Sequence, residues 1–214
     1  REKVTYIPNF VNKEKWHPLP KEEVLRLRED LGLDQHQFIV VGAGQVQKRK
    51  GIDDFIRLAE ELPQITFIWA GGFSFGGMTD GYEKYKKMME NPPKNLLFPG
   101  IVTPERMREL YSLADIFLLP SYNELFPMTI LEAASCDAPI MLRDLDLYKV
   151  ILEGNYHATA DKDEMKQSIL EYQKNPDSLK ELKEKSKKIS REYSEEHLLQ
   201  IWLEFYQEQA ALGR

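Results

Sequence analysis

The sequence predicts an α/β protein whose core is a Rossmann-like open parallel sheet with helices on both faces. Continuous apolar runs such as 38–43 and 115–119 are typical of parallel strands, because helices cover such strands on both sides. These runs alternate with segments of helical periodicity, and short loops join them. Repeated strand–helix units favour right-handed crossovers within one sheet. The chain has 214 residues, of which 42% are hydrophobic, and this is enough for a single domain over 1–214.

The first half of the chain predicts strands that alternate with helices. Residues 4–7 form a short run that ends at Pro8, and we expect a strand there. Apolar side chains recur at helical spacing in 20–33, and Gly32 is typical of a helix C-terminus. The following strands are expected at 38–43, 65–70 and 95–98, and the following helices at 52–62, 82–90 and 104–113. The last of these helices begins with Pro104, and proline is favoured at the first helical position.

The second half continues this alternation and ends in helices. The apolar run 115–119 predicts a strand, and the stretch from Pro127 onward predicts a helix with proline at its first position. Further strands are expected at 138–142 and 156–159, with a helix at 145–152 between them. From Asp161 to its end the chain is predicted to be helical, with breaks near 175–176 and 193–194.

Composition excludes several classes of partner. The formal net charge of −6 predicts no basic surface for nucleic acid, so we expect no nucleic-acid partner. No apolar run approaches the roughly 20 residues that a membrane-spanning helix needs. The one cysteine, Cys136, cannot form an internal disulfide, and this suits a reducing compartment. We therefore expect a cytoplasmic protein, either free or peripheral at the inner face of the membrane.

Two glutamates indicate a ligand site at the carboxyl ends of the strands, where such sheets bind their ligands. Glu124 lies in the loop after the 115–119 strand, and Glu132 lies inside the helix that follows. The free N–H groups of the first helical turn lie between the two carboxylates. This layout suits a sugar nucleotide: the loop carboxylate would bind the sugar, the helix N-terminus the phosphates, and the second carboxylate the ribose. The alternative is one exposed loop glutamate and one helix-surface glutamate.

The residues around these glutamates resemble a known family. Glu124, seven further residues and Glu132-Ala133, behind an apolar strand that ends in Pro120-Ser121, are similar to the donor-site signature of retaining glycosyltransferases of family four. That family has the GT-B fold, so the resemblance implies the C-terminal, donor-binding half of a GT-B fold. It also implies that Glu124 is catalytic and accepts hydrogen bonds from the sugar hydroxyls, and that Glu132 accepts them from the ribose diol.

The loop 42–51 carries a second part of the resemblance. The family has Gly-Arg-Leu-x-x-x-Lys-Gly here, and its Arg and Lys hold the donor diphosphate. Four residues fall in register: Gly44, Val46, Lys50 and Gly51. Lys50 is thereby implied to be donor-binding and catalytic, whereas the arginine position holds the neutral Gln45. Charge-assisted bonds to phosphate are stronger than neutral ones, so Arg49 or Lys48 would supply the missing charge; a solvated basic loop is the alternative.

The resemblance implies further donor contacts in two other turns. Where the family has Glu-Gly-Phe-Gly, this chain has Glu-Leu-Phe-Pro, so Phe126 keeps its place in the donor site. Because Pro127 has no N–H, the phosphate contacts would come from the first-turn amides of Met128 and Thr129. The turn 98–102 matches a family turn whose backbone groups read the base, and Ile101 lies in it.

The Gly-rich loop 71–77 contains Phe73 and Phe75, and it is longer and more aromatic than its family counterpart. The two rings would either line the donor or acceptor pocket or pack against a neighbouring domain. Together with 78–83, this loop is similar to glycolipid-forming members of the family that glycosylate diacylglycerol in Gram-positive bacteria. The resemblance therefore implies a membrane lipid as the acceptor.

The sequence contains no convincing motif for a metal or a cofactor. Asp144 and Asp146 follow an apolar strand, and such a pair can hold a divalent cation, but we favour a loop or helix cap because the donor site is complete without them. The segment 42–44 lacks the third glycine of a dinucleotide fingerprint, which argues against a nicotinamide site. We therefore expect neither a metal nor a cofactor. Asp137 replaces a family glycine at a helix end, where it would tolerate left-handed geometry less well.

The two ends of the chain are predicted to lie at the boundary with a second domain. Residues 7–12 resemble the family's junction between its two Rossmann-like domains, so the resemblance covers nearly the whole chain from about residue 4. It implies that the N-terminal acceptor domain is absent from this sequence. The last helix, 194–212, is rich in apolar side chains and is expected to cross to that missing domain. Without that domain, the same apolar surface would favour self-association.

The expected function is transfer of a hexose from a nucleotide-diphosphate sugar to an acceptor hydroxyl, with retention of configuration. The resemblance to glycolipid-forming members favours UDP-glucose or UDP-galactose as the donor. The expected partners are this donor, the missing N-terminal domain and a membrane lipid acceptor, and the chain alone is expected to be inactive. Two alternatives stay open: a GT-B nucleotide-sugar epimerase, and a non-catalytic domain that binds a nucleotide sugar.

Overall fold

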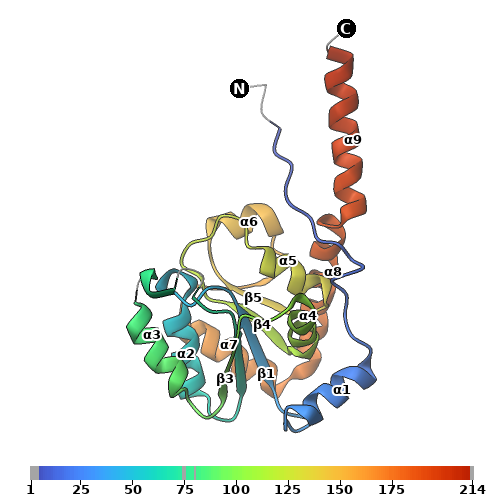
Figure 1. The fold of residues 1–214 in the computed structure, drawn as a ribbon. Coiled ribbons are helices and arrows are strands. Elements are labelled where there is room, and N and C mark those ends of the chain that lie inside the picture. Colours follow the sequence, from blue (N-terminus) through green and yellow to red (C-terminus); the bar gives the residue numbers. More distant parts are fainter. Residues whose placement is uncertain (1–4, 74–75, 80, 213–214) are drawn as a thin grey trace.

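The computed structural model describes residues 5–73, 76–79 and 81–212. In this part of the chain, six strands form one parallel sheet in the order β3-β2-β1-β4-β5-β6 (Figure 1). The strands are β1 (Ile39–Ala43), β2 (Thr66–Ala70), β3 (Leu96–Gly100), β4 (Ile116–Leu119), β5 (Ile140–Arg143) and β6 (His157–Thr159). In the centre of the sheet, Val40 of β1 is paired with both Phe67 of β2 and Ile116 of β4. The predicted fold class is confirmed.

Helices cover both faces of the sheet (Figure 1). On one face α4 (Pro104–Leu113), α5 (Met128–Ser135) and α8 (Leu179–Glu192) pack side by side, and α1 (Lys21–Asp30) packs against α4. On the other face α2 (Ile52–Glu61) packs against α7 (Lys162–Lys174). The remaining helical segments are α3 (Tyr82–Glu90), α6 (Asp146–Leu152), α9 (Glu195–Leu212) and the 3-10 turns η1 (Lys48–Lys50), η2 (Gly76–Met78) and η3 (Pro176–Ser178).

The strand order creates a switch point between β1 and β4. From β1 the sheet grows through β2 to β3 on one side, and then the chain returns to add β4, β5 and β6 on the other side. In open α/β sheets, ligands bind in the crevice at such a point, outside the carboxyl ends of the strands. The loops after β1 and β4 contain Lys50 and Glu124, so the topology brings these two residues to the same crevice.

The core is built from the continuous apolar runs that predict the strands. Every residue of β1, β2, β4 and β5 is buried. Between the sheet and α2, the Phe55 ring contacts Trp69 and Phe67 edge-on, with ring centroids 5.0 and 5.4 Å apart. Burying such large aromatic side chains contributes about 1.5–3 kcal/mol each. The loops of the crevice are therefore mounted on a rigid, close-packed layer.

Two details of the predicted elements are wrong. The predicted strand 4–7 is not formed by its described residues 5–7, and Val4 lies outside the described part. The first strand-like contact is instead an isolated bridge between Val11 and Ser194, which joins this segment to the start of α9. Pro127 precedes α5 rather than beginning it, because its ψ of 99° is extended and its carbonyl accepts a bond from Ile130. The other predicted strands and helices are found, with ends that differ by a few residues.

Helix α9 extends away from the rest of the protein (Figure 1). Leu198 is buried at its base, whereas Leu199, Leu203 and Tyr206 are exposed. Higher in the helix, Trp202 stacks on Tyr206 with ring centroids 5.6 Å apart. Within the described residues, none of the helices combines the length and apolar character of a membrane span. The contact of this helix with a further domain stays a prediction.

Candidate functional site

Two loops meet at the carboxyl ends of β1 and β4. Gly51 has a φ of +74°, and a Cβ added to it would lie 2.2 Å from the carbonyl oxygen of Pro120, so only glycine permits this approach. The Tyr122 amide donates a hydrogen bond of 2.9 Å to the carbonyl of Arg49. These backbone contacts hold the lysine-bearing loop directly against the glutamate-bearing loop.

Lys50 and Glu124 form an ion pair across these loops. The Lys50 Nζ lies 2.6 Å from Oε1 and 2.9 Å from Oε2 of Glu124. Ser121 donates a further bond of 2.6 Å to Oε1, and Arg49 lies 3.5 Å from Oε2. The Glu124 side chain is only 4% exposed and that of Lys50 14%. Shielding from water strengthens the attraction between the two charges. An anion that binds Lys50 therefore has to compete with the Glu124 carboxylate.

Glu132 lies just over one turn into α5 and is half-buried. The Tyr111 hydroxyl of α4 donates a hydrogen bond of 3.0 Å to its carboxylate. Burial raises the pKa of Glu132 above its ordinary value of 4.5, and the bond from Tyr111 partly opposes this rise. Burial and the nearby Glu132 charge raise the pKa of Tyr111 well above its ordinary value, so the phenol stays a donor. The second Glu132 oxygen is therefore the one suited to accept from a ligand.

A hollow of about 150 Å³ brings several predicted donor contacts together. Its lining includes Gly44, Ile101, Thr129 and Glu132. Gly44 also touches the stem of Lys50, whose Cε lies 3.6 Å from the position that a Gly44 Cβ would take. Gly44 therefore adjoins both the stem of Lys50 and the hollow, although the lining of the hollow includes neither Lys50 nor Glu124.

The first residue of the Gly-rich loop 71–77, Gly71, has no room for a side chain. A Cβ on Gly71 would lie 1.9 Å from the carbonyl oxygen of Gly44, and that same oxygen accepts a bond of 3.2 Å from the Trp69 indole. Beside it, Gln47 donates a bond of 2.5 Å to the side-chain oxygen of Gln45. This bond orients the Gln45 amide, so that its nitrogen is the atom that could donate to a phosphate.

Not every predicted contact lies at the hollow. The Phe126 ring packs toward α8, with its centroid 5.9 Å from that of Tyr193, so the structure does not bring it to Glu132. Met128 is partly buried against the core, and only its backbone amide, at the start of α5, is suited to a ligand. Ile101 is 75% exposed at the rim. Phe73 packs edge-on against Tyr82, and Phe75 lies outside the described residues.

Asp144 and Asp146 are engaged with a lysine. Each lies 3.2 Å from the Nζ of Lys149, and Leu145 rather than an aspartate is the residue before α6. Among the described residues there is no group of three or more His, Cys, Asp or Glu side chains with the geometry of a metal site. Of the expected loop or helix cap, the loop is therefore found: Asp144 lies in the loop before α6, and neither aspartate caps the helix. Asp137 has a φ of +59°, which confirms the left-handed geometry predicted there.

The comparison with known families agrees with the geometry of the crevice. Residues 24–189 match the model of the family described as glycosyl transferases group 1. The chain belongs to this family. This match spans every strand of the sheet and both loops of the ion pair.

Two curated relatives are glycolipid-forming enzymes by name. The chain is 86% identical over 214 residues to alpha-galactosylglucosyldiacylglycerol synthase of Streptococcus pneumoniae (strain ATCC BAA-255 / R6). The match covers all of this chain and 57% of that protein. The chain is 36% identical over 128 residues to the processive diacylglycerol alpha-glucosyltransferase of Acholeplasma laidlawii, covering 60% of this chain and 38% of that protein. The chain thus spans little more than half of the first relative. The predicted resemblance to glycolipid-forming glycosyltransferases is confirmed.

Solved structures of low identity share the fold. Anabaena Alr3699/HepE in complex with UDP-glucose matches with a TM-score of 0.81 and 18% identity, over 98% of this chain and 58% of that one. Sucrose-phosphate synthase from Thermosynechococcus elongatus matches with a TM-score of 0.80 and 20% identity, over 96% of this chain and 52% of that one. These likenesses confirm that this chain has the fold of one half of a GT-B glycosyltransferase.

Sequence reasoning missed residues that hold the site of this glycosyltransferase chain in place. Tyr111 orients Glu132, and Ser121 orients Glu124. A buried ion pair between Arg143 and Asp54 lies directly behind both loops. The available signal was an arginine at the end of the otherwise apolar run 138–143, because a charge there is buried only if it finds a partner.

Proposed function

We propose that this chain binds the nucleotide-sugar donor of a retaining glycosyltransferase that forms a glycolipid, with UDP-glucose or UDP-galactose as the donor. The observation that carries the proposal is the shielded Lys50–Glu124 ion pair at the switch point of the sheet. A cation and a sugar-binding carboxylate are the two groups that a sugar diphosphate requires side by side. The printed names of the pneumococcal and Acholeplasma relatives support the glycolipid class.

Each part of the donor has a matching group. Lys50, with Gln45 and the amides of Met128 and Thr129, would bind the diphosphate, and Glu132 would accept from the ribose diol. Glu124 would accept from the sugar hydroxyls once it releases Lys50. As the anomeric C–O bond breaks, negative charge grows on the departing diphosphate, and Lys50 stabilises it where it develops. Because Lys50 and the helix terminus supply this stabilisation, we propose that transfer needs neither a metal nor a cofactor.

The proposal extends to the whole protein. An acceptor domain would close over the crevice, and α9, with its exposed Leu199 and Leu203, would cross to it. The acceptor hydroxyl would then attack the anomeric carbon on the face from which the diphosphate leaves, so the configuration is retained. We place the whole enzyme in the cytoplasm, at the inner face of the membrane, because a diacylglycerol acceptor resides in that membrane.

A titration of the chain with UDP tests the binding proposal. We expect heat of binding and chemical-shift changes at Gly44, Lys50 and Thr129. Lys50→Met should weaken the binding by about tenfold or more, since it removes a charge-assisted bond. Lys94→Met is the matched control, because Lys94 is exposed and lies just before β3, at the amino ends of the strands. If millimolar UDP gives neither heat nor shift changes, the proposal is wrong. ADP and GDP, titrated in parallel, test the choice of base.

A further inference from the structure

A buried ion pair lies behind the two loops of the proposed donor site. Arg143 ends β5, and its Nη2 lies 2.5 Å from the Oδ2 of Asp54 in the first turn of α2. The two side chains are only 9% and 10% exposed. Isolated charges are costly to bury, so a pair at this depth is retained where its geometry is well satisfied. Neither residue contacts the hollow beside Glu132.

The Arg143 guanidinium connects the pair to the glutamate loop. Its Nε donates a bond of 3.1 Å to the carbonyl of Pro120, and its Nη1 donates one of 3.3 Å to the carbonyl of Ala160. The ring of Tyr122 lies against the guanidinium, with 4.1 Å from Cζ to the ring centroid. The Tyr122 hydroxyl also donates a bond of 2.6 Å to Asp54. Pro120 and Tyr122 are thus both fixed within four residues of Glu124.

The same pair connects to the lysine loop through α2. Asp54 lies four residues after Lys50, separated from it by Gly51 and the first turn of the helix. Gly51 in turn contacts the Pro120 carbonyl, and Tyr122 bonds to Arg49. The loop that carries Glu124 and the helix that follows Lys50 therefore share a single buried anchor.

We infer that Arg143 is a positioning residue that, through Asp54 and Tyr122, sets the separation of Lys50 and Glu124 for donor binding. This inference rests on the proposed function, since it concerns the same site. A lysine cannot replace Arg143 in this role, because the role uses a planar fork with donors in three directions and a stacked ring. Arg143 touches no substrate; it acts only through the residues of the two loops.

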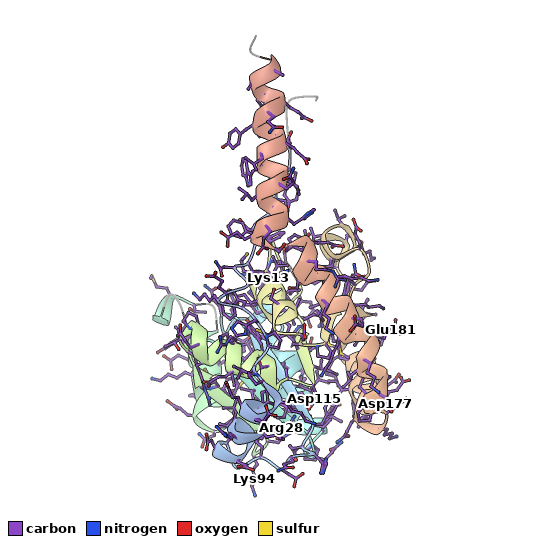
Figure 2. The ribbon with its side chains drawn as sticks, turned by 90° about the vertical axis from the view of Figure 1, so that its right-hand side faces the viewer. Lys13, Arg28, Lys94, Asp115, Asp177 and Glu181 are labelled. Carbon is purple, nitrogen blue, oxygen red and sulfur yellow. The ribbon has the colours of Figure 1, made fainter. Side chains whose placement is uncertain are left out.

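The chain contains a matched pair at the opposite, amino-terminal ends of the strands. Arg28 and Asp115 are also a half-buried Arg–Asp pair, with 3.3 Å between Nη2 and Oδ2 and side chains 9% and 30% exposed. Figure 2 shows them side by side in the part of the molecule far from α9. Asp115 accepts from the Ile39 amide, and Arg28 donates to the Gln37 carbonyl, so this pair serves the amino ends of the strands. Arg28→Lys is therefore the control for Arg143→Lys.

Two measurements on the chain test the inference. The first is UDP affinity by calorimetry, which should fall by about tenfold in Arg143→Lys and stay unchanged in Arg28→Lys. The second is hydrogen exchange of the Tyr122 amide, which bonds to Arg49 across the two loops. This exchange should become about tenfold faster in Arg143→Lys only, because opening the loops exposes that amide. The thermal midpoint of both variants shows whether they lose comparable stability.

The outcomes separate this inference from the proposed function. If both variants weaken UDP binding and speed exchange equally, Arg143 only stabilises the fold and the inference is wrong. If the unchanged chain does not bind UDP, the proposed function fails, and the Tyr122 exchange still decides whether Arg143 holds the loops together. If Arg143→Lys does not fold, Tyr122→Leu replaces it, because residue Tyr122 is 51% exposed and the substitution leaves both members of the buried pair in place. Unchanged UDP affinity in that variant would also overturn the inference.

Discussion

Replacing Glu124 with glutamine should have opposite effects on nucleotide binding and on sugar transfer. In the structure, both carboxylate oxygens of Glu124 lie within 3 Å of the Lys50 Nζ, at 2.6 and 2.9 Å. A diphosphate that binds Lys50 has to displace this carboxylate, and Glu124 also repels the diphosphate charge. In E124Q the competitor is neutral, so UDP should bind more tightly. Transfer should be lost, because the carboxylate no longer accepts from the sugar hydroxyls.

The size of the effect follows from the ion pair. A hydrogen bond to a charged group contributes about 1.5–3 kcal/mol, and this pair is shielded, with side chains 14% and 4% exposed. The amide oxygen of the variant still accepts from Lys50 and Ser121, which retains part of that energy. We therefore expect the lower end of the range, which corresponds to UDP affinity about tenfold higher. Turnover of the whole enzyme should fall by roughly a hundredfold or more, as it does when a transition-state contact is removed.

Calorimetric titration with UDP, at one salt concentration for all variants, measures this prediction. Glu61→Gln is the matched control, because Glu61 also pairs with lysines, Lys162 and Lys166, but at the far end of α2. That variant should bind UDP like the unchanged chain. If E124Q is folded and its UDP affinity is equal or lower, the ion pair does not compete with the diphosphate, and the reasoning is refuted.

Three further predictions concern the backbone of the crevice, the pH dependence of UDP binding and self-association. Gly51→Ala should lower the free energy of unfolding in urea by about 2 kcal/mol or more, because its Cβ would meet Pro120. Gly32→Ala is the control: Gly32 has a φ of +66° but open space around it, so the loss should be about 1 kcal/mol, and equal losses in the two variants would refute the clash. UDP affinity should fall as the pH drops from neutral through the raised pKa of Glu132, above 4.5, because protonation removes the acceptor, and Glu132→Gln should flatten this dependence. Trp202→Gln should shift the chain toward the monomer in sedimentation, because it removes an exposed ring from the apolar face of α9. An unchanged distribution of species would show that this face takes no part in association.

The strands were predictable because parallel strands carry their signal in one local run. Residues 67–70 and 116–119 are apolar throughout, and helices bury both of their faces. The same logic failed at 4–7, because β propensity does not supply a neighbouring strand. In the described residues 5–7 there is no such neighbour, and Val11 is the first residue to pair. Propensity predicts a strand only where the topology provides a partner.

The sequence predicted that Lys50 and Glu124 come together, but it did not predict the direction of every loop side chain. Lys50 and Glu124 lie 74 positions apart, and the resemblance together with the carboxyl-end rule was needed to bring them together. Phe126 shows the limit of that approach. Loop residues have no periodicity from which a side-chain direction follows, and this ring packs against Tyr193 instead of facing the hollow.

Arg143 was missed because its role depends on a distant partner. A charge at the end of an apolar run usually marks the point where a strand reaches solvent. Here the partner, Asp54, lies 89 positions earlier, on the polar side of the α2 pattern, and only the fold brings the two together. The arginine that ends the run 138–143 shows only that a partner is needed, and the identity of that partner is found only after the topology is known.

The neutral Gln45 makes the Glu124 exchange more important in this chain. Where the resemblance implies an arginine for the diphosphate, Gln45 adds no charge, and Pro127 adds no amide to the start of α5. The cations paired with Glu124 are Lys50 and Arg49, each within 3.5 Å of its carboxylate. In the proposed donor complex, Glu124 would turn to the sugar hydroxyls and would release both cations to the diphosphate at once. The sugar and the diphosphate should therefore bind cooperatively, so that the complete donor binds more tightly than the separate contacts of UDP and sugar would add up to.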